Sequence, residues 1–197
     1  MISIYQLKPK FQALLQPVLN TLRRWGFTPN SLTILAFFLS LGTGLYCYFG
    51  NPTIALFLLP ICLLLRMALN ALDGMMARQF NLQSKLGAVL NEMGDVLSDI
   101  VLYYPFLILV GITSEWIGCF LLLTVINEFA GLLGQALGGD RRYDGPMGKS
   151  DRAFVIGLMS LLIGLKIPKE YFLNGYVWVL IFGLIIWSTL KRLKHAL

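Results

Sequence analysis

The chain has 197 residues, of which 57% are hydrophobic and only 13% are charged, and its formal net charge is +6. Soluble domains carry about a quarter charged residues, so this composition excludes an ordinary soluble domain and favours an integral membrane protein. The length suffices for one helical bundle and leaves no room for a second domain. We therefore expect one all-α membrane domain over residues 1–197, with an interfacial segment over 1–30 and six transmembrane helices over 31–190.

The first segment, residues 4–24, repeats apolar side chains at helical spacing and carries basic residues near both ends. Leu15, Leu19 and Leu22 recur three and four residues apart within it. This pattern is typical of an amphipathic helix that lies in the membrane interface. Pro17 interrupts the pattern and weakens its regularity.

Six apolar stretches of 17 to 28 residues follow, and a helix needs roughly 20 residues to cross a bilayer. They span residues 31–49, 53–79, 84–111, 115–137, 151–167 and 172–190. The breaks between them are short and contain Gly, Pro, Asn or charged residues, as in "FGNP", "GITSE" and "KIPKE". The sequence therefore predicts six transmembrane helices joined mostly by short turns.

The basic residues indicate how these spans are oriented. With six spans, both termini, the turn after the second span and the loop after the fourth share one side of the membrane. Thirteen Lys and Arg residues lie on that side or at its helix ends, whereas only Lys166 and Lys169 lie on the other. The positive-inside rule then places both termini in the cytoplasm, with the protein in the cell inner membrane. Anchoring against anionic lipid accounts for most of the net charge, which argues against nucleic-acid binding.

The second and third spans contain an unusual polar stretch, "NALDGMMARQFNLQSKLGAVLNEMGD". Asn70 and Asp73 are three residues apart, and Asn91 and Asp95 are four apart, so each pair shares a helix face. The short turn "NLQS" makes the two helices antiparallel neighbours, so these faces meet near the cytoplasmic boundary. Ionisable groups in membrane spans are costly and usually functional. Several hard oxygen ligands beside Arg78 favour a divalent cation that holds a phosphate, with the active site on the cytoplasmic side.

This stretch resembles the signature of the CDP-alcohol phosphatidyltransferases, Asp-x2-Asp-Gly-x2-Ala-Arg-x8-Gly-x3-Asp-x3-Asp. The chain has a residue at every spacing of that signature, and six of the eight are identical to it. The eight positions are Asn70, Asp73, Gly74, Ala77, Arg78, Gly87, Asn91 and Asp95. The preceding "GFTPNSLT" is similar to the Thr-Pro-Asn segment of the family, and the six-span layout also agrees, so the resemblance covers nearly the whole chain.

The resemblance implies a reaction and a set of residue roles. Members of the family displace CMP from a CDP-linked lipid, such as CDP-diacylglycerol, with an alcohol as nucleophile, and in the usual picture four acids hold two divalent metals. By position, Asp73 would be a metal ligand and Asp95 both a ligand and the general base, with Mg²⁺ or Mn²⁺ as the cofactor. Gly74 and Arg78 would contact the CDP group. Ala77, Ser84, Gly87, Asn30 and Thr33 would lie near it, although the small residues also permit close helix packing.

Two departures from the signature leave alternatives open. Asn70 and Asn91 stand where the family has its first and third aspartates, and an amide oxygen ligates a hard cation without bringing negative charge. The site would then hold one tight metal, or two weaker ones with help from Glu92 or Asp99. Alternatively, the chain is a non-catalytic CDP-lipid-binding membrane protein on the same scaffold. We favour the enzyme, because the retained signature residues have little use once catalysis is lost.

The alcohol acceptor should enter from the same cytoplasmic face. Lys149 and Arg152 are three residues apart at the start of a span, so they could point together into the cavity and bind a phosphorylated acceptor. Family members with such acceptors have a comparable basic pair, but both residues also follow the positive-inside rule. For Arg141 and Arg142 the second interpretation, charge anchoring, is favoured. Relatives are often dimeric, which leaves a homodimer as an open alternative.

Three further charged residues lie deep within the spans. Arg66 falls four residues before Asn70 on the same helix face, and Glu128 is the acid inside the fourth span. We predict a structural ion pair between Arg66 and Glu128, which would satisfy both charges. Asp99 sits about 6 Å deeper than Asp95 by helical rise and is expected to orient a ligand or cation. A transporter that uses these charges as a relay would leave the signature spacing without a reason, and no inverted repeat supports it.

Overall fold

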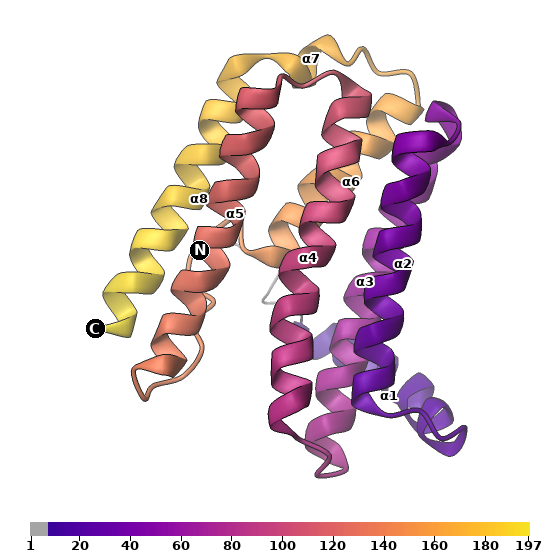
Figure 1. Cartoon of the computed structure of the whole chain (residues 1–197), viewed down its shortest axis with the longest axis vertical. Coiled ribbons are helices and arrows are strands. Elements are labelled where there is room, and N and C mark those ends of the chain that lie inside the picture. The colour runs from indigo at the N-terminus through magenta and orange to yellow at the C-terminus, as the bar shows by residue number, and fades with distance from the viewer. Residues whose placement is uncertain (1–7) are drawn as a thin grey trace.

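The computed structural model describes residues 8–197, and this part of the chain folds into helices without strands (Figure 1). The helices are α1 (Lys8–Arg24), α2 (Pro29–Phe49), α3 (Pro52–Gln79), α4 (Lys85–Val110), α5 (Ser114–Ala136), α6 (Lys149–Gly164), α7 (Glu170–Leu173) and α8 (Gly175–Ala196). The all-α prediction is confirmed for the described residues. Residues 4–7 of the predicted interfacial helix lie outside them.

Local capping sequences determine where the helices around the polar stretch begin. The Thr28 side chain accepts a hydrogen bond from the Ser31 N–H at 3.2 Å, and the Ser31 side chain accepts one from the Thr28 N–H at 2.9 Å. This capping box starts α2, and Pro29 follows at a position where its missing N–H costs nothing. Ser84 caps α4 by accepting from the Gly87 N–H at 3.0 Å. These caps set the register of the side chains that follow on both helices.

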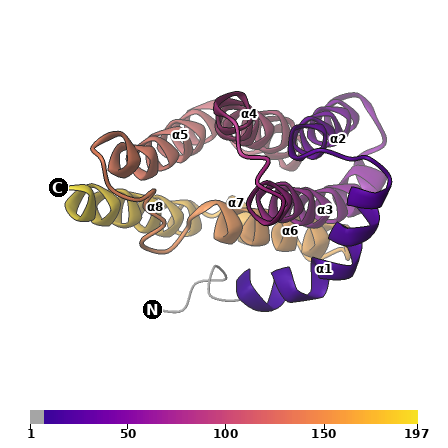
Figure 2. The same cartoon turned by 90° about the horizontal axis from the view of Figure 1, so that it is seen from below.

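The long helices lie in two rows when seen from below, with α5, α4 and α2 in one row and α8, α6 and α3 in the other (Figure 2). Successive long helices run in opposite directions (Figure 1). As a result α1, the turn between α3 and α4, the loop between α5 and α6, and the C-terminus lie toward the same end. Outside the rows, α1 packs on α3, where Leu19 joins Leu72 and Met76 in a small apolar cluster. The polar stretch therefore lies at the end that carries the basic segments.

Five of the helices are long and apolar enough to cross a bilayer, namely α2, α3, α4, α5 and α8. The chain is therefore an integral membrane protein. In contrast, α6 has 16 residues, which at about 1.5 Å per residue span roughly 24 Å, less than the hydrocarbon core of roughly 30 Å. The prediction of six membrane-spanning helices is accordingly not confirmed, because α6, which lies in the fifth predicted span, is too short.

The loop between α5 and α6 explains why α6 is short, because it folds back into the bundle. The Arg142 N–H donates to the Gly131 carbonyl of α5 at 3.0 Å, and a Cβ at Gly131 would lie only 2.7 Å from the Arg142 carbonyl oxygen. On the other side, the Ser188 hydroxyl of α8 donates to the Asp144 carbonyl at 2.9 Å. Gly145 turns the chain here with a φ of +91°. The loop is thus clamped between α5 and α8, and α6 begins inside the bundle (Figure 1).

The apolar core holds the rows together. Tyr103, Phe120 and Trp178 are buried at its centre, and their rings make edge and tilted contacts. Helices α2 and α4 approach so closely that a Cβ at Gly44 would lie 2.0 Å from the Val101 carbonyl oxygen. This packing fixes α2 and α4 against each other and so positions the polar ends of both helices.

Candidate functional site

A cavity of about 480 Å³ lies between the polar ends of α2, α3 and α4, and the loop between α5 and α6 completes its wall. Ten residues predicted from the sequence line it: Asn30, Thr33, Asn70, Asp73, Gly74, Ala77, Arg78, Ser84, Gly87 and Asn91. The predicted residues Asp95, Lys149 and Arg152 lie outside this wall. The oxygen-bearing faces of α3 and α4 therefore meet at one cavity.

Asp73 contributes a carboxylate to the cavity from α3, although its residue is only 5% exposed. The Thr33 hydroxyl, on the second turn of α2, donates to Asp73 Oδ2 at 2.7 Å. Hydrogen bonds to a charged acceptor are shorter and stronger than neutral ones. Because the capping box at Thr28 sets the register of α2, the same local sequence also places the hydroxyl that orients Asp73.

Two glycines allow side chains to approach the cavity. A Cβ at Gly87 would lie 2.8 Å from Asn30 Oδ1, so the bare glycine lets the Asn30 side chain of α2 pack against α4. A Cβ at Gly74 would lie 3.4 Å from Arg78 Nη1, which shows that the guanidinium lies back along α3 beside Gly74. Both glycines line the cavity, and Gly87 also permits close contact between α2 and α4.

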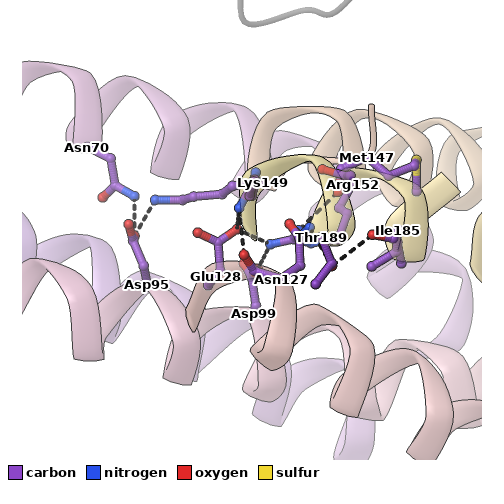
Figure 3. A network of polar contacts seen from close by, with 12 residues as sticks. Asn70, Asp95, Asp99, Asn127, Glu128, Met147, Lys149, Arg152, Ile185 and Thr189 are labelled. Atoms are coloured by element: carbon purple, nitrogen blue, oxygen red, sulfur yellow. Dashed lines mark hydrogen bonds and ion pairs between the residues drawn. The ribbon is translucent and has the colours of Figure 1, made fainter. Parts of the chain in front are cut away.

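Asp95 lies behind the cavity wall on α4, where three side chains direct nitrogen donors toward it. Asn70 Nδ2 donates to Asp95 Oδ1 at 2.7 Å, and the Lys149 ammonium forms an ion pair with the same oxygen. Figure 3 shows both nitrogens directed at the carboxylate. Arg66 Nη2 donates to the main-chain carbonyl of Asp95 at 2.9 Å. Asn70 lines the cavity as well, so it joins Asp95 to the space in which Asp73 lies.

A buried charge network continues inward from Asp95. Asp99 contacts Arg66 at 2.5 Å through one carboxylate oxygen and Arg152 at 3.1 Å through the other. Arg152 also donates to Glu128 at 2.7 Å (Figure 3). The predicted ion pair between Arg66 and Glu128 is therefore wrong, because Arg66 on α3 faces α4 whereas Glu128 on α5 faces the start of α6. The expected role of Asp99 also changes, since its carboxylate orients two arginines.

Lys149 and Arg152 do not point together into the cavity. Arg152 is 0% exposed, and it also donates to Asn127 Oδ1 at 3.2 Å and to the Met147 carbonyl at 3.0 Å. The Lys149 side chain is 23% exposed and reaches Asp95. The prediction that both basic residues contact a ligand is therefore wrong for Arg152, because the inward course of the preceding loop carries its guanidinium into the bundle.

Arg141 is a cavity residue that the sequence pattern assigned to charge anchoring alone. It lines the cavity and forms ion pairs with Glu92 of α4 and, at 3.1 Å, with Glu128 of α5. Its guanidinium also lies 5.1 Å from the centroid of the Tyr143 ring. No local pattern could have indicated these contacts, because Glu92 lies 49 residues away in the sequence. Arg141 joins the site only because its loop docks on the glycines of α5.

The oxygen atoms at the cavity fit a hard divalent cation. Asp73 offers a carboxylate, and Asn70 and Asn91 offer amide oxygens, which are ligand types that Mg²⁺ and Mn²⁺ accept. Within residues 8–197 no group of three His, Cys, Asp or Glu side chains could hold a metal. This agrees with asparagine at two of the signature positions. The donor set therefore suits a cation that completes its coordination with phosphate oxygens and water.

Known proteins match this chain over most of its length. The family described as CDP-alcohol phosphatidyltransferase has a model that matches residues 27–190. The inner membrane protein YnbA of Escherichia coli K12 is 44% identical over 196 residues, which cover 100% of this chain and 97% of that protein. The archaetidylinositol phosphate synthase of Pyrococcus horikoshii is 29% identical over 164 residues, which cover 82% of this chain and 84% of that protein.

Two crystal structures of the phosphatidylinositol phosphate synthase of Mycobacterium tuberculosis share the fold. The structure with CDP-diacylglycerol bound has a TM-score of 0.70 and 21% identity, over 91% of this chain and 92% of that chain. The structure in complex with manganese and citrate has a TM-score of 0.71 and 21% identity, over 91% of this chain and 87% of that chain. At this identity the likeness concerns the fold.

Proposed function

Because the chain belongs to the CDP-alcohol phosphatidyltransferase family, we propose that it transfers a phosphatidyl group from a CDP-linked lipid to an alcohol and releases CMP. The observation that carries the proposal is the convergence of α3 and α4 at the cavity. Asp73 lines it, Asn70 lies in the same wall, and Asn70 donates to Asp95 at 2.7 Å. A solved relative of the same fold has CDP-diacylglycerol bound, which supports a CDP-lipid as the donor.

In the proposed reaction, the hydroxyl oxygen of the acceptor attacks the lipid-side phosphorus of the diphosphate. The bond from that phosphorus to the bridging oxygen breaks, the bridging oxygen leaves with CMP, and the hydroxyl proton passes to the Asp95 carboxylate. Arg78 and the main chain at Gly74 hold the diphosphate, while Asn30, Ser84 and Gly87 shape the space for the nucleotide.

A divalent cation, Mg²⁺ or Mn²⁺, belongs to the proposal. When bound it would neutralise diphosphate charge and stabilise the departing CMP. The residues proposed to hold it are Asp73 and the amide oxygens of Asn70 and Asn91, with Asp95 close by. The manganese in a solved relative supports the cofactor class.

We further propose that the cavity faces the cytoplasm. The inward loop and α6 together would form a sixth pass across the membrane, because the loop supplies the depth that the short helix lacks. Both termini then lie on the side that holds thirteen of the sixteen Lys and Arg residues. The match to an inner membrane protein supports the same membrane for this chain.

For the acceptor we propose an alcohol that carries a phosphate. Arg141 lines the cavity and offers a guanidinium suited to phosphate oxygens. The relative from Pyrococcus horikoshii, named archaetidylinositol phosphate synthase, supports an acceptor of this class.

The test is CMP release by the purified protein in nanodiscs that contain CDP-diacylglycerol, with Mg²⁺ or Mn²⁺. Inositol phosphate and glycerol phosphate are compared with inositol and glycerol, and the lipid product is identified by mass spectrometry. We expect CMP to appear in equal amount to a new phospholipid, and faster with the phosphorylated alcohols. Tight CDP-lipid binding without CMP release in any reaction would instead indicate a non-catalytic lipid-binding protein.

A further inference from the structure

The side chains around Asp95 suggest how the site could bind the substrate with Asn70 and Asn91 in place of the two signature aspartates. Asp95 Oδ1 accepts from the Asn70 amide and pairs with the Lys149 ammonium (Figure 3). Arg66 Nη2 lies 3.6 Å from the same oxygen. A carboxylate only accepts hydrogen bonds, so Asn70 must present its NH₂ group here. Nitrogen donors and positive charge therefore occupy the surroundings of Asp95 Oδ1, which a metal ion would otherwise fill.

The position of Lys149 is built into the fold. Lys149 is the first residue of α6, and Arg152 anchors the same helical turn through Asp99, Glu128 and the Met147 carbonyl. Arg152 is fully buried, so the backbone that carries Lys149 is tied to the interior of the bundle. An ammonium on such a backbone is directed at one carboxylate, unlike a lysine that moves freely in solvent.

Asp73 has a different environment. It lines the cavity, and its hydrogen-bond donor among side chains is the neutral hydroxyl of Thr33 at 2.7 Å. Asn91 lines the same cavity and adds an amide oxygen. Within residues 8–197 no Lys or Arg forms a direct ion pair with Asp73, whereas Asp95 already has the Lys149 ammonium beside it.

Other acids near the cavity are engaged. Glu92 pairs with Arg141, and Asp99 pairs with Arg66 and Arg152. Recruiting either acid as a replacement metal ligand would break at least one ion pair that is buried or largely buried, which is costly. The two acids that the sequence offered as substitutes are therefore committed to the charge network.

We infer that the Lys149 ammonium takes the place of one metal ion at Asp95, and that the site binds a single divalent cation on Asp73 and the asparagine amides. This inference rests on the proposed function. A second divalent ion at Asp95 would face the ammonium at close range, and with Asn70 and Asn91 it would lack the negative charge needed to offset that repulsion. One divalent ion together with Lys149 and Arg78 supplies enough positive charge to balance Asp73, Asp95 and the diphosphate.

The test is a Mn²⁺ titration of the full chain in nanodiscs containing CDP-diacylglycerol, without acceptor. Free Mn²⁺ is followed by electron paramagnetic resonance, and empty nanodiscs of the same lipid provide the background. We expect the wild-type chain to bind one Mn²⁺, and Lys149→Met to bind it roughly tenfold more tightly because a nearby positive charge is gone. Lys149→Arg should remain close to wild type, and combining Asn70→Asp with Lys149→Met should open a second Mn²⁺ site.

Lys194→Met is the matched control, because it removes the same charge from an exposed residue at the same end of the molecule. Two Mn²⁺ per wild-type chain would overturn the inference, and so would equal affinities in Lys149→Met and Lys194→Met. The wild-type stoichiometry decides the matter even if a variant fails to fold. CMP release with acceptor, measured on the same samples, separates the two proposals. One Mn²⁺ without CMP release overturns the transfer reaction alone, and two Mn²⁺ with CMP release overturns the lysine role alone.

Discussion

Arg66 of α3 and Asp99 of α4 contact each other at 2.5 Å, and both side chains are 2% exposed. The same guanidinium donates to the main-chain carbonyl of Asp95 at 2.9 Å. The link therefore ties α3 to α4 one turn below Asp95 and fixes the height at which Asp95 faces Asn70. A structural ion pair of this kind positions a site residue without touching the substrate.

Asp99→Asn should destabilise the bundle strongly. It removes the carboxylate that Arg66 and Arg152 share, and breaking a buried pair typically costs about 3–5 kcal/mol. Because Arg152 keeps Glu128 and Arg66 keeps Asp95 as partners, we expect a loss toward the lower end of that range. Thermal unfolding in detergent measures the loss. Asp144→Asn is the matched control, because the pair of Asp144 with His195 is partly exposed and should contribute less than about 1 kcal/mol. Equal melting shifts in the two variants would contradict the proposed importance of the buried network.

Thr33→Val should weaken cation binding while leaving the fold intact. The change preserves the shape of the side chain but removes the 2.7 Å hydrogen bond to Asp73, and hydrogen bonds to charged groups contribute about 1.5–3 kcal/mol. We expect Mn²⁺ affinity to fall roughly tenfold or more. Ser40→Ala is the control on the same helix, since that hydroxyl bonds only to the Ala36 carbonyl among the contacts described. If Thr33→Val kept the wild-type Mn²⁺ affinity, the proposed contribution of Thr33 to cation binding would be wrong.

Gly87→Ala should impair substrate binding more than stability. The added methyl would lie 2.8 Å from Asn30 Oδ1 and would displace the Asn30 side chain from its place in the cavity wall. Overpacking of this kind typically costs about 1–3 kcal/mol, so the KM for CDP-diacylglycerol should rise roughly tenfold. Gly118→Ala has no atom within 4 Å of the new methyl and should leave the KM unchanged. If both variants keep the wild-type KM, the proposed role of Gly87 in shaping the cavity wall is wrong.

Cysteine labelling should reveal that the inward loop and α6 together cross the membrane. In a cysteine-free background, Lys169→Cys should react with an impermeant maleimide in right-side-out vesicles, because it lies beyond α6. Leu137→Cys and Lys194→Cys, at the end that holds the cavity, should react only in inverted vesicles. If Leu137→Cys and Lys169→Cys label from the same side, α6 does not cross and the proposed orientation fails.

The sequence predicted most helix boundaries because breaks and caps are local. The span expected over 84–111 is α4 (Lys85–Val110), and the span expected over 115–137 is α5 (Ser114–Ala136). The spacing of the polar stretch likewise brought the expected faces of α3 and α4 to one cavity. Helical periodicity and a short antiparallel turn are enough to predict both features.

The buried charge network could not be predicted in the same way. Arg66 sits on a known face of α3, but whether it meets Asp99 or Glu128 depends on how α4 and α5 are rotated around it. The inward loop was missed for a similar reason. In the sequence, Gly131 on α5 looks like any small residue of a membrane helix. Only the structure shows that the Arg142 carbonyl packs against it. The role of Arg141 and the inward course of the loop before α6 both follow from that tertiary contact.

The central claim is that Asp73 and Asp95 act together on the diphosphate of a CDP-linked lipid. The most direct measurement is CMP release from CDP-diacylglycerol with Mn²⁺ and a phosphorylated alcohol, comparing wild type with Asp73→Asn, Asp95→Asn and the control Asp144→Asn. We predict that Asp73→Asn and Asp95→Asn each lower the rate by roughly 10²-fold or more, while both stay folded and Asp144→Asn keeps the wild-type rate. Wild-type CMP release by Asp73→Asn or Asp95→Asn would contradict the claim.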